Sequence, residues 1–156
     1  MKTISFFGHS TIIDNDELSQ RVKQVLAEEM CKGCSEFLIG CHGDFDSIAL
    51  QCCLDFKKEV DPAVKITAVL TSLSFLKKDE FGYGKAEFYK KKGCQTIMYD
   101  IEEVHYKNRI NYSNRKMVDN SDIIICFVDM KAYRSGAKRA INYALRRNKK
   151  VINLYS

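Results

Sequence analysis

Three short segments of the sequence combine glycines with side chains that can bind a ligand, and two of them follow an apolar run directly. The first is Gly8-His9-Ser10, the second extends from Gly40 to Asp46, and the third is Ser135-Gly136. Glycine lets the backbone turn tightly and lets a ligand approach it closely. Histidine, serine and aspartate side chains supply hydrogen-bonding groups. The residue types predict a polar binding site if the fold brings the three segments together, although a purely local turn is an equal alternative for Gly8 and His9.

The second segment, Gly40-Cys41-His42-Gly43-Asp44-Phe45-Asp46, has the composition of a glycine-bracketed turn that opens a helix. Such a turn presents backbone N–H groups at the positive end of the helix dipole, where phosphate binds. Asp44 is the expected N-cap. Asp46 is expected to accept a hydrogen bond from a ribose hydroxyl or to act at a glycosidic carbon. The segment contains neither the dinucleotide fingerprint nor a P-loop, so an ordinary turn is equally consistent with the pattern.

Arg115 is a further candidate for ligand binding and lies shortly before the most apolar run of the chain. A guanidinium group can fork onto a phosphate or a carboxylate. The alternative is an ion pair with Asp119, four residues on. Ser135-Gly136 is predicted to open a second helix whose N-terminus frames a cleft together with the first. The later basic residues, from Lys138 to Lys150, are interpreted as a solvated helix face with cations at its C-terminal end.

Strands and helices that alternate along the chain must position these residues. The predicted strands cover residues 3–7, 36–39, 64–70, 96–99, 122–128 and 151–154. The predicted helices cover about 16–32 (capped by Asp14 or Asn15), 45–60, 84–92 within a long loop over 71–94, 112–120, and a last helix from Ser135 to about Asn148.

This alternation predicts one α/β domain over residues 1–156, a Rossmann-like three-layer sandwich. Nearly continuous apolar strands joined by helices favour a mainly parallel sheet with right-handed crossovers and helices on both faces. Open sheets of this kind bind ligands outside the carboxyl ends of their strands. The three glycine segments and Arg115 all lie after or beside such ends. The architecture therefore predicts where the site lies before any residue chemistry is considered.

Composition excludes several classes of protein. Hydrophobic residues make up 46% and charged residues 29% of the sequence, and no apolar run reaches the ~20 residues of a membrane span. The start of the chain is read as a strand and not as a signal peptide. Seven cysteines, an odd number, favour a reducing cytosol, and the placement of Cys31-x-x-Cys34 argues against a redox motif. We expect neither a metal nor a cofactor. The net charge of +5 mildly favours anionic partners.

Taken together, four motifs resemble the SLOG superfamily, the Rossmann-like group that includes the LOG phosphoribohydrolases and the DprA/Smf proteins. They are Gly8-His9, the Gly40–Asp46 segment, Asn114-Arg115-x-Met117-Val118-Asp119-x-Ser121-Asp122, and Ser135-Gly136. The similarity covers nearly the whole chain and is greatest to small stand-alone bacterial and phage members. It implies a nucleotide site at the carboxyl edge of the sheet and a homodimer.

The same resemblance also marks a difference from the LOG enzymes. In that family an arginine and a later glutamate serve the cleavage of a nucleoside monophosphate into base and ribose phosphate. Arg115 matches the arginine. Gly136 matches a glycine of the family segment that carries the glutamate, but Ala140 stands where that glutamate is expected. Cleavage of an N-glycosidic bond needs a carboxylate to stabilise charge or to activate water. LOG-type catalysis is therefore not expected unless Asp46 supplies that carboxylate.

Three functions follow as hypotheses. The first is binding or sensing of a nucleotide or a nucleotide-derived ligand by Gly8, His9, Ser10, Gly40, His42, Gly43, Asp44, Asp46, Arg115, Ser135 and Gly136. The second is an N-glycoside hydrolase or transferase, with Asp46 and Arg115 as candidate catalytic residues. The third is single-stranded DNA binding through Lys90-Lys91-Lys92 and the late basic residues, with Tyr83, Tyr89 or Tyr133 stacking on bases. The modest net charge makes the third the weakest.

Overall fold

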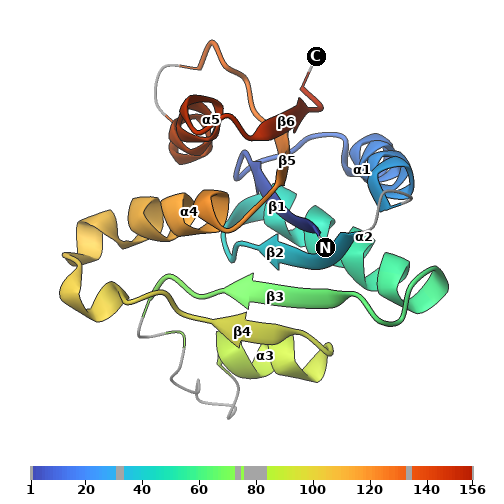
Figure 1. The fold of residues 1–156 in the computed structure, drawn as a ribbon, viewed down its shortest axis with the longest axis horizontal. Coiled ribbons are helices and arrows are strands. Elements are labelled where there is room, and N and C mark those ends of the chain that lie inside the picture. The colour runs from blue at the N-terminus through green and yellow to red at the C-terminus, as the bar shows by residue number, and fades with distance from the viewer. Residues whose placement is uncertain (1, 31–33, 73–74, 76–83, 133–134, 156) are drawn as a thin grey trace.

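The computed structural model describes residues 2–30, 34–72, 75, 84–132 and 135–155. Within these residues six strands form one parallel sheet in the order β4-β3-β2-β1-β5-β6 (Figure 1). The strands are β1 (Lys2–Gly8), β2 (Cys34–Ile39), β3 (Lys65–Val69), β4 (Gln95–Ile97), β5 (Ile123–Phe127) and β6 (Lys150–Asn153). The predicted α/β fold with a parallel sheet is confirmed.

Helices connect the strands as the sequence predicted. They are α1 (Asn15–Met30), α2 (Gly43–Glu59), α3 (Lys85–Lys91), α4 (Arg109–Asp119) and α5 (Gly136–Arg146), and two short 3-10 turns, η2 (Ile101–Glu103) and η3 (Tyr106–Asn108), precede α4. Asp14 caps α1, since its Oδ1 accepts a 3.2 Å hydrogen bond from the Glu17 N–H. Gly33, Cys31 and part of the loop 71–94 lie outside the described residues.

The two faces of the sheet bury separate apolar layers. On one face β-strand residues such as Phe37 and Ile66 pack with α1, α2 and α3. On the other face Leu38 and Ile124 pack with α4 and α5. Side chains of successive strand residues point to opposite faces, which explains how Phe37 and Leu38 join different layers. The result is the predicted three-layer sandwich.

The order of the strands reverses between β1 and β5. From β1 the chain proceeds outward through β2, β3 and β4, and it then returns to place β5 on the other side of β1. Helices α1 and α2 cover one face, whereas α4, which lies within the return, and α5, which follows β5, cover the other. The loops after β1 and β5 therefore diverge to opposite faces, and the crevice between them is where parallel sheets of this type bind ligands.

One expected cap is wrong. Helix α2 begins at Gly43 with His42 in the N-cap position, not Asp44. The Asp44 carboxylate instead accepts a 2.8 Å hydrogen bond from the Ile12 backbone N–H. The aspartate therefore anchors the loop after β1 to the start of α2, a long-range role that the local sequence does not reveal.

Candidate ligand site at the carboxyl edge of the sheet

A cavity of about 510 Å³ opens at the carboxyl ends of β1 and β2, between the N-terminal ends of α2 and α5. Eight of the eleven predicted site residues line it: Gly8, His9, Ser10, Gly40, His42, Asp46, Ser135 and Gly136. The other lining residues were not among the predicted site residues, although two of them belong to the motif around Arg115: they are Thr11, Thr71, Ile110, Asn114, Met117, Ala132 and Ala137, together with the strand residues Phe6 and Phe7. Segments far apart in the sequence thus share one hollow.

Gly43 and Asp44 do not line this cavity, because they join α2 to the loop after β1. The Asp44 N–H donates to the Ser10 carbonyl at 2.9 Å, and the Phe45 N–H donates to the His9 carbonyl at 3.4 Å. These first-turn amides of α2 are therefore occupied by the protein itself. The expectation that they hold a phosphate does not fit this geometry.

Two glycines allow that close junction. A Cβ on Gly8 would lie 2.3 Å from Cγ of Phe45, and a Cβ on Gly43 would lie 2.5 Å from Cα of Ser10. Gly43 also has a φ of +87°, a conformation that side-chain-bearing residues rarely adopt. The glycines therefore bring the β1 loop and the α2 start into contact, and this contact forms one wall of the cavity.

Asp46 is the carboxyl group of the cavity. Its Oδ2 accepts a 2.8 Å hydrogen bond from the His42 backbone N–H. A Cβ on Gly40 would lie 2.7 Å from the same oxygen, so the glycine leaves room for the carboxyl group. Burial raises the pKa of Asp46 to about 7, while the His42 N–H and the charge of Lys85 act in the opposite direction. The group can therefore exchange a proton near neutral pH.

A polar pair lies on the cavity wall beside Asp46, and a cation that does not itself line the cavity lies close to both. Nε2 of His42 lies 2.5 Å from Oγ1 of Thr71, at the end of β3. Burial and the nearby positive charge of Lys85 lower the pKa of His42, so both favour the neutral form of its ring. Lys85 Nζ donates a 2.6 Å hydrogen bond to the Cys41 carbonyl. Thr71 and Lys85 escaped sequence analysis because neither lies in a glycine-containing motif.

His9, in the loop after β1, is held by the backbone after β5. Its Nε2 accepts a 2.8 Å hydrogen bond from the Asp129 N–H, so this nitrogen carries no proton. The rings of Phe127 and Tyr155 meet the His9 ring edge-on, with centroids 6.2 and 6.0 Å away. His9 therefore ties β1 to β5 across the point where the strand order reverses.

The start of α5 is the helix N-terminus that remains open to the cavity. The Ser135 side chain accepts a 3.3 Å hydrogen bond from the Lys138 N–H, as an N-cap does. The Gly136 and Ala137 N–H groups have no acceptor among the described residues. A Cβ on Gly136 would meet nothing within 4 Å. This helix start thus offers two amide donors and free space to a ligand.

Arg115 lies outside the main cavity, in an adjoining groove of about 280 Å³ between α4 and α5. Asn114 and Gly136 line both hollows. The alternative ion pair with Asp119 does not form, because Asp119 accepts from the Tyr143 hydroxyl at 2.8 Å and lies 3.5 Å from Nε of Arg147. Ala140 lines the same groove, so no carboxylate occupies that position.

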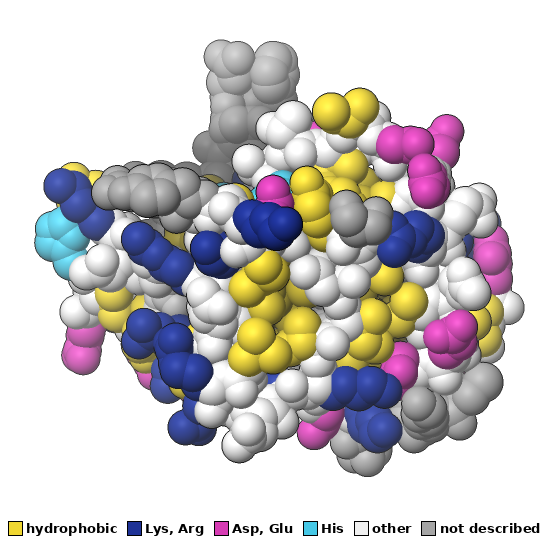
Figure 2. Space-filling view, turned by 90° about the horizontal axis from the view of Figure 1, so that it is seen from above, with side chains coloured by type: hydrophobic (Ala, Val, Ile, Leu, Met, Phe, Trp, Pro, Cys, Tyr) yellow, Lys and Arg dark blue, Asp and Glu magenta, His cyan; other side chains and the backbone are white. Residues whose placement is uncertain are grey.

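Charge is distributed unevenly over the surface that carries α5. Figure 2 shows more Lys and Arg side chains toward the side of α4 and α5, and more Asp and Glu side chains toward the side of α1. Tyr89 is 7% exposed and cannot stack on a base, and Tyr83 and Tyr133 lie outside the described residues. The exposed Lys90, Lys91 and Lys92 end α3, beside β4, at the far edge of the sheet from α5.

No three His, Cys, Asp or Glu side chains among the described residues gather closely enough to hold a metal ion. In the same part of the chain, no helix has the length and apolar character needed to cross a membrane.

No protein-family model matches the chain, and no curated protein matches it.

Proposed function

We propose that the protein binds a nucleotide or a nucleotide-derived ligand in the cavity at the carboxyl edge of the sheet. The observation that carries this proposal is the convergence, in one hollow of about 510 Å³, of a half-buried carboxyl group and a helix N-terminus whose first amides have no acceptor among the described residues. A nucleoside phosphate needs both features, because its sugar hydroxyls donate hydrogen bonds and its phosphate accepts them. The volume is within the range of small-ligand sites.

The proposed orientation follows from which groups are available. In the proposed orientation the Gly136 and Ala137 amides donate hydrogen bonds to a phosphate group of the ligand. The positive end of the α5 dipole adds to this attraction. Asp46 accepts from a sugar hydroxyl, with Thr71 and Asn114 as further polar partners on the cavity wall. The start of α2 plays no part in phosphate binding in this scheme, since its amides donate to Ser10 and His9.

A binding panel tests the proposal. Calorimetry against mononucleotides, cyclic nucleotides and ADP-ribose should show binding by at least one member, and Asp46→Ala should weaken it by about tenfold or more, as expected for the loss of a charge-assisted hydrogen bond. Asp55→Ala is the matched control, since Asp55 lies on the same helix but outside this cavity. Failure of every ligand to bind would contradict the proposal.

A second candidate function is the cleavage of an N-glycosidic bond, and the raised pKa of Asp46 favours it. A carboxyl group that ionises near pH 7 is suited to activate a water molecule for attack on the anomeric carbon while the base departs. The fold supplies Asp46 from α2, whereas Ala140 on α5 supplies no acid.

Release of free base from nucleoside monophosphates, followed by chromatography, tests this second function. The parent protein should release base, and Asp46→Asn should lower the rate by about 100-fold or more, because an amide cannot accept the proton. Equal rates for the two proteins would remove Asp46 from the role. Absence of release from the parent, with binding retained, would leave binding as the function.

A further inference from the structure

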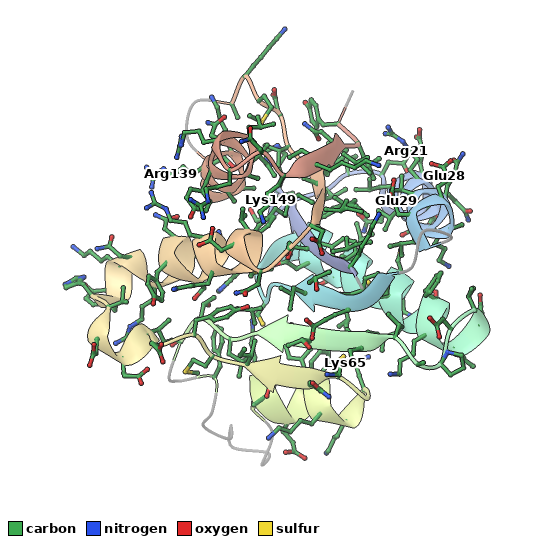
Figure 3. The ribbon with its side chains drawn as sticks, viewed as in Figure 1. Arg21, Glu28, Glu29, Lys65, Arg139 and Lys149 are labelled. Atoms are coloured by element: carbon green, nitrogen blue, oxygen red, sulfur yellow. The ribbon has the colours of Figure 1, made fainter. Side chains whose placement is uncertain are left out.

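The groove between α4 and α5 is rich in cations and amides. The charged residues in its lining are Arg115, Arg139 and Arg146, with no acidic residue among the described ones. Its other polar side chains are Asn111, Asn114 and Asn142. Figure 3 shows Arg139 on α5, projecting away from the sheet. A cavity with this lining presents hydrogen-bond donors and positive charge, and thus suits an anion.

The sequence periods of the two helices place these cations together. Arg139 and Arg146 are seven residues apart, two turns of α5, and therefore lie on one face of the helix. Arg115 reaches the same groove from α4. The guanidinium groups of Arg115 and Arg146 lie 5.3 and 6.0 Å from the centre of the Tyr143 ring, a distance at which cation–π attraction holds them.

These arginines are not used to balance acidic side chains of the helix pair. Asp119 is the one acidic residue in the sequences of α4 and α5, and it is engaged by Tyr143 and Arg147. The structure records ion pairs for none of the three groove arginines with any described residue. Three neighbouring guanidinium groups repel one another, so a bound anion would relieve an unfavourable arrangement.

We infer that the groove holds the further phosphates of the ligand, so that the preferred ligand class is a nucleoside diphosphate or a more highly phosphorylated nucleotide. This inference rests on the proposed function. Gly136 and Asn114 line both hollows, and the space beside Gly136 is open, so a phosphate chain that starts at the α5 amides can continue into the groove. The groove thus extends the cavity.

The number of cations fits more than one phosphate. A terminal phosphate monoester carries about two negative charges at neutral pH, and each further phosphate of a chain adds about one. The α5 amides already suit the first phosphate, and three arginines in about 280 Å³ exceed what that group needs. A nucleic-acid backbone is less well served, because Lys90, Lys91 and Lys92 lie at the opposite edge of the sheet and do not continue the arginine surface.

Calorimetry with the four ribonucleoside monophosphates and the four diphosphates, each on the full chain, tests the inference. For the base that binds, the diphosphate should bind at least about tenfold more tightly than the monophosphate. The double variant Arg139→Gln and Arg146→Gln should abolish that preference and leave monophosphate affinity within about twofold. Arg147→Gln is the control, because it removes the same kind of charge from the end of α5 but lies outside the groove.

The possible results separate failure of this inference from failure of the proposed function. Equal affinities for mono- and diphosphates in the parent would overturn the inference and leave the proposed function intact, whereas no nucleotide binding at all would remove both. If Arg147→Gln lowered diphosphate affinity as much as the double variant, general charge would explain the effect and the groove would not. Filter binding to a single-stranded oligonucleotide is the last measurement. If the double variant lost oligonucleotide binding but kept its diphosphate affinity, the arginines would be assigned to nucleic-acid binding and not to the nucleotide.

Discussion

Asp46→Asn is expected to be more stable than the parent protein at pH 8, by on the order of 4 kcal/mol, and about equally stable near pH 4. The folded pKa of Asp46 is about 7, above the 3.8 of an ordinary aspartate. The folded state therefore holds a proton that the unfolded state releases between those values. Stability from this group is fully present below about pH 4 and is lost as the pH rises through 7.

Urea unfolding of both proteins between pH 4 and pH 8 measures this difference. Asp55→Asn serves as the control, since Asp55 lies on the same helix and pairs with Lys23 at 3.0 Å. That ion pair lowers the pKa of Asp55, so its removal should act in the opposite direction and lower stability at pH 8. A stability gap between Asp46→Asn and the parent that did not change with pH would contradict the assigned burial of the carboxyl group.

The expected penalty bears on function. An ionised carboxylate in a partly buried cavity destabilises the folded protein at neutral pH, and an asparagine of nearly the same shape would avoid that cost. A ligand that donates hydrogen bonds to Asp46 would offset it, as a sugar hydroxyl does. Proteins keep such destabilising groups chiefly at sites where the group is used. The stability measurement thus tests a premise that both candidate functions share.

Sequence alone predicts the fold well because the central strands β1, β3 and β5 are largely buried and therefore nearly continuously apolar. Short, isoleucine-rich apolar runs such as 122–128 favour buried strands, and the helices between them favour a parallel sheet. The start of α1 is also a local feature, because the capping residue Asp14 is followed directly by an amphipathic helix. It could therefore be predicted from the sequence. The fold was accessible because each of its determinants lies within a short stretch of sequence.

The site was less accessible, because its polar partners come from distant segments. The α2 amides point to the Ser10 and His9 carbonyls, which no pattern within the helix indicates. Thr71 has no neighbouring motif, and only the alignment of β3 with β2 brings it to His42. The basic residues of α5 were interpreted as a solvated face, and their convergence with Arg115 depends on the packing of two helices.

Gly43→Ala is expected to destabilise the protein by on the order of 3 kcal/mol, the other large effect that the site geometry predicts. Two costs combine at this position. The φ of +87° is strained for any residue with a side chain, and the added Cβ would lie 2.5 Å from the backbone Cα of Ser10. Since the second contact is with backbone, the loop after β1 must move away from α2. Urea unfolding at pH 7 measures the loss of stability.

Gly136→Ala is the matched comparison, because both glycines open a helix at the edge of the cavity. A Cβ at Gly136 meets no atom within 4 Å, and alanine is the better helix former, so stability should change by less than about 1 kcal/mol and in the favourable direction. Ligand affinity should nevertheless fall, since the methyl group occupies the space beside the α5 amides. If Gly43→Ala were as stable as Gly136→Ala, the loop after β1 would be free to shift, and the wall that it forms with α2 could not hold Asp46 and His9 in the positions on which ligand binding is argued.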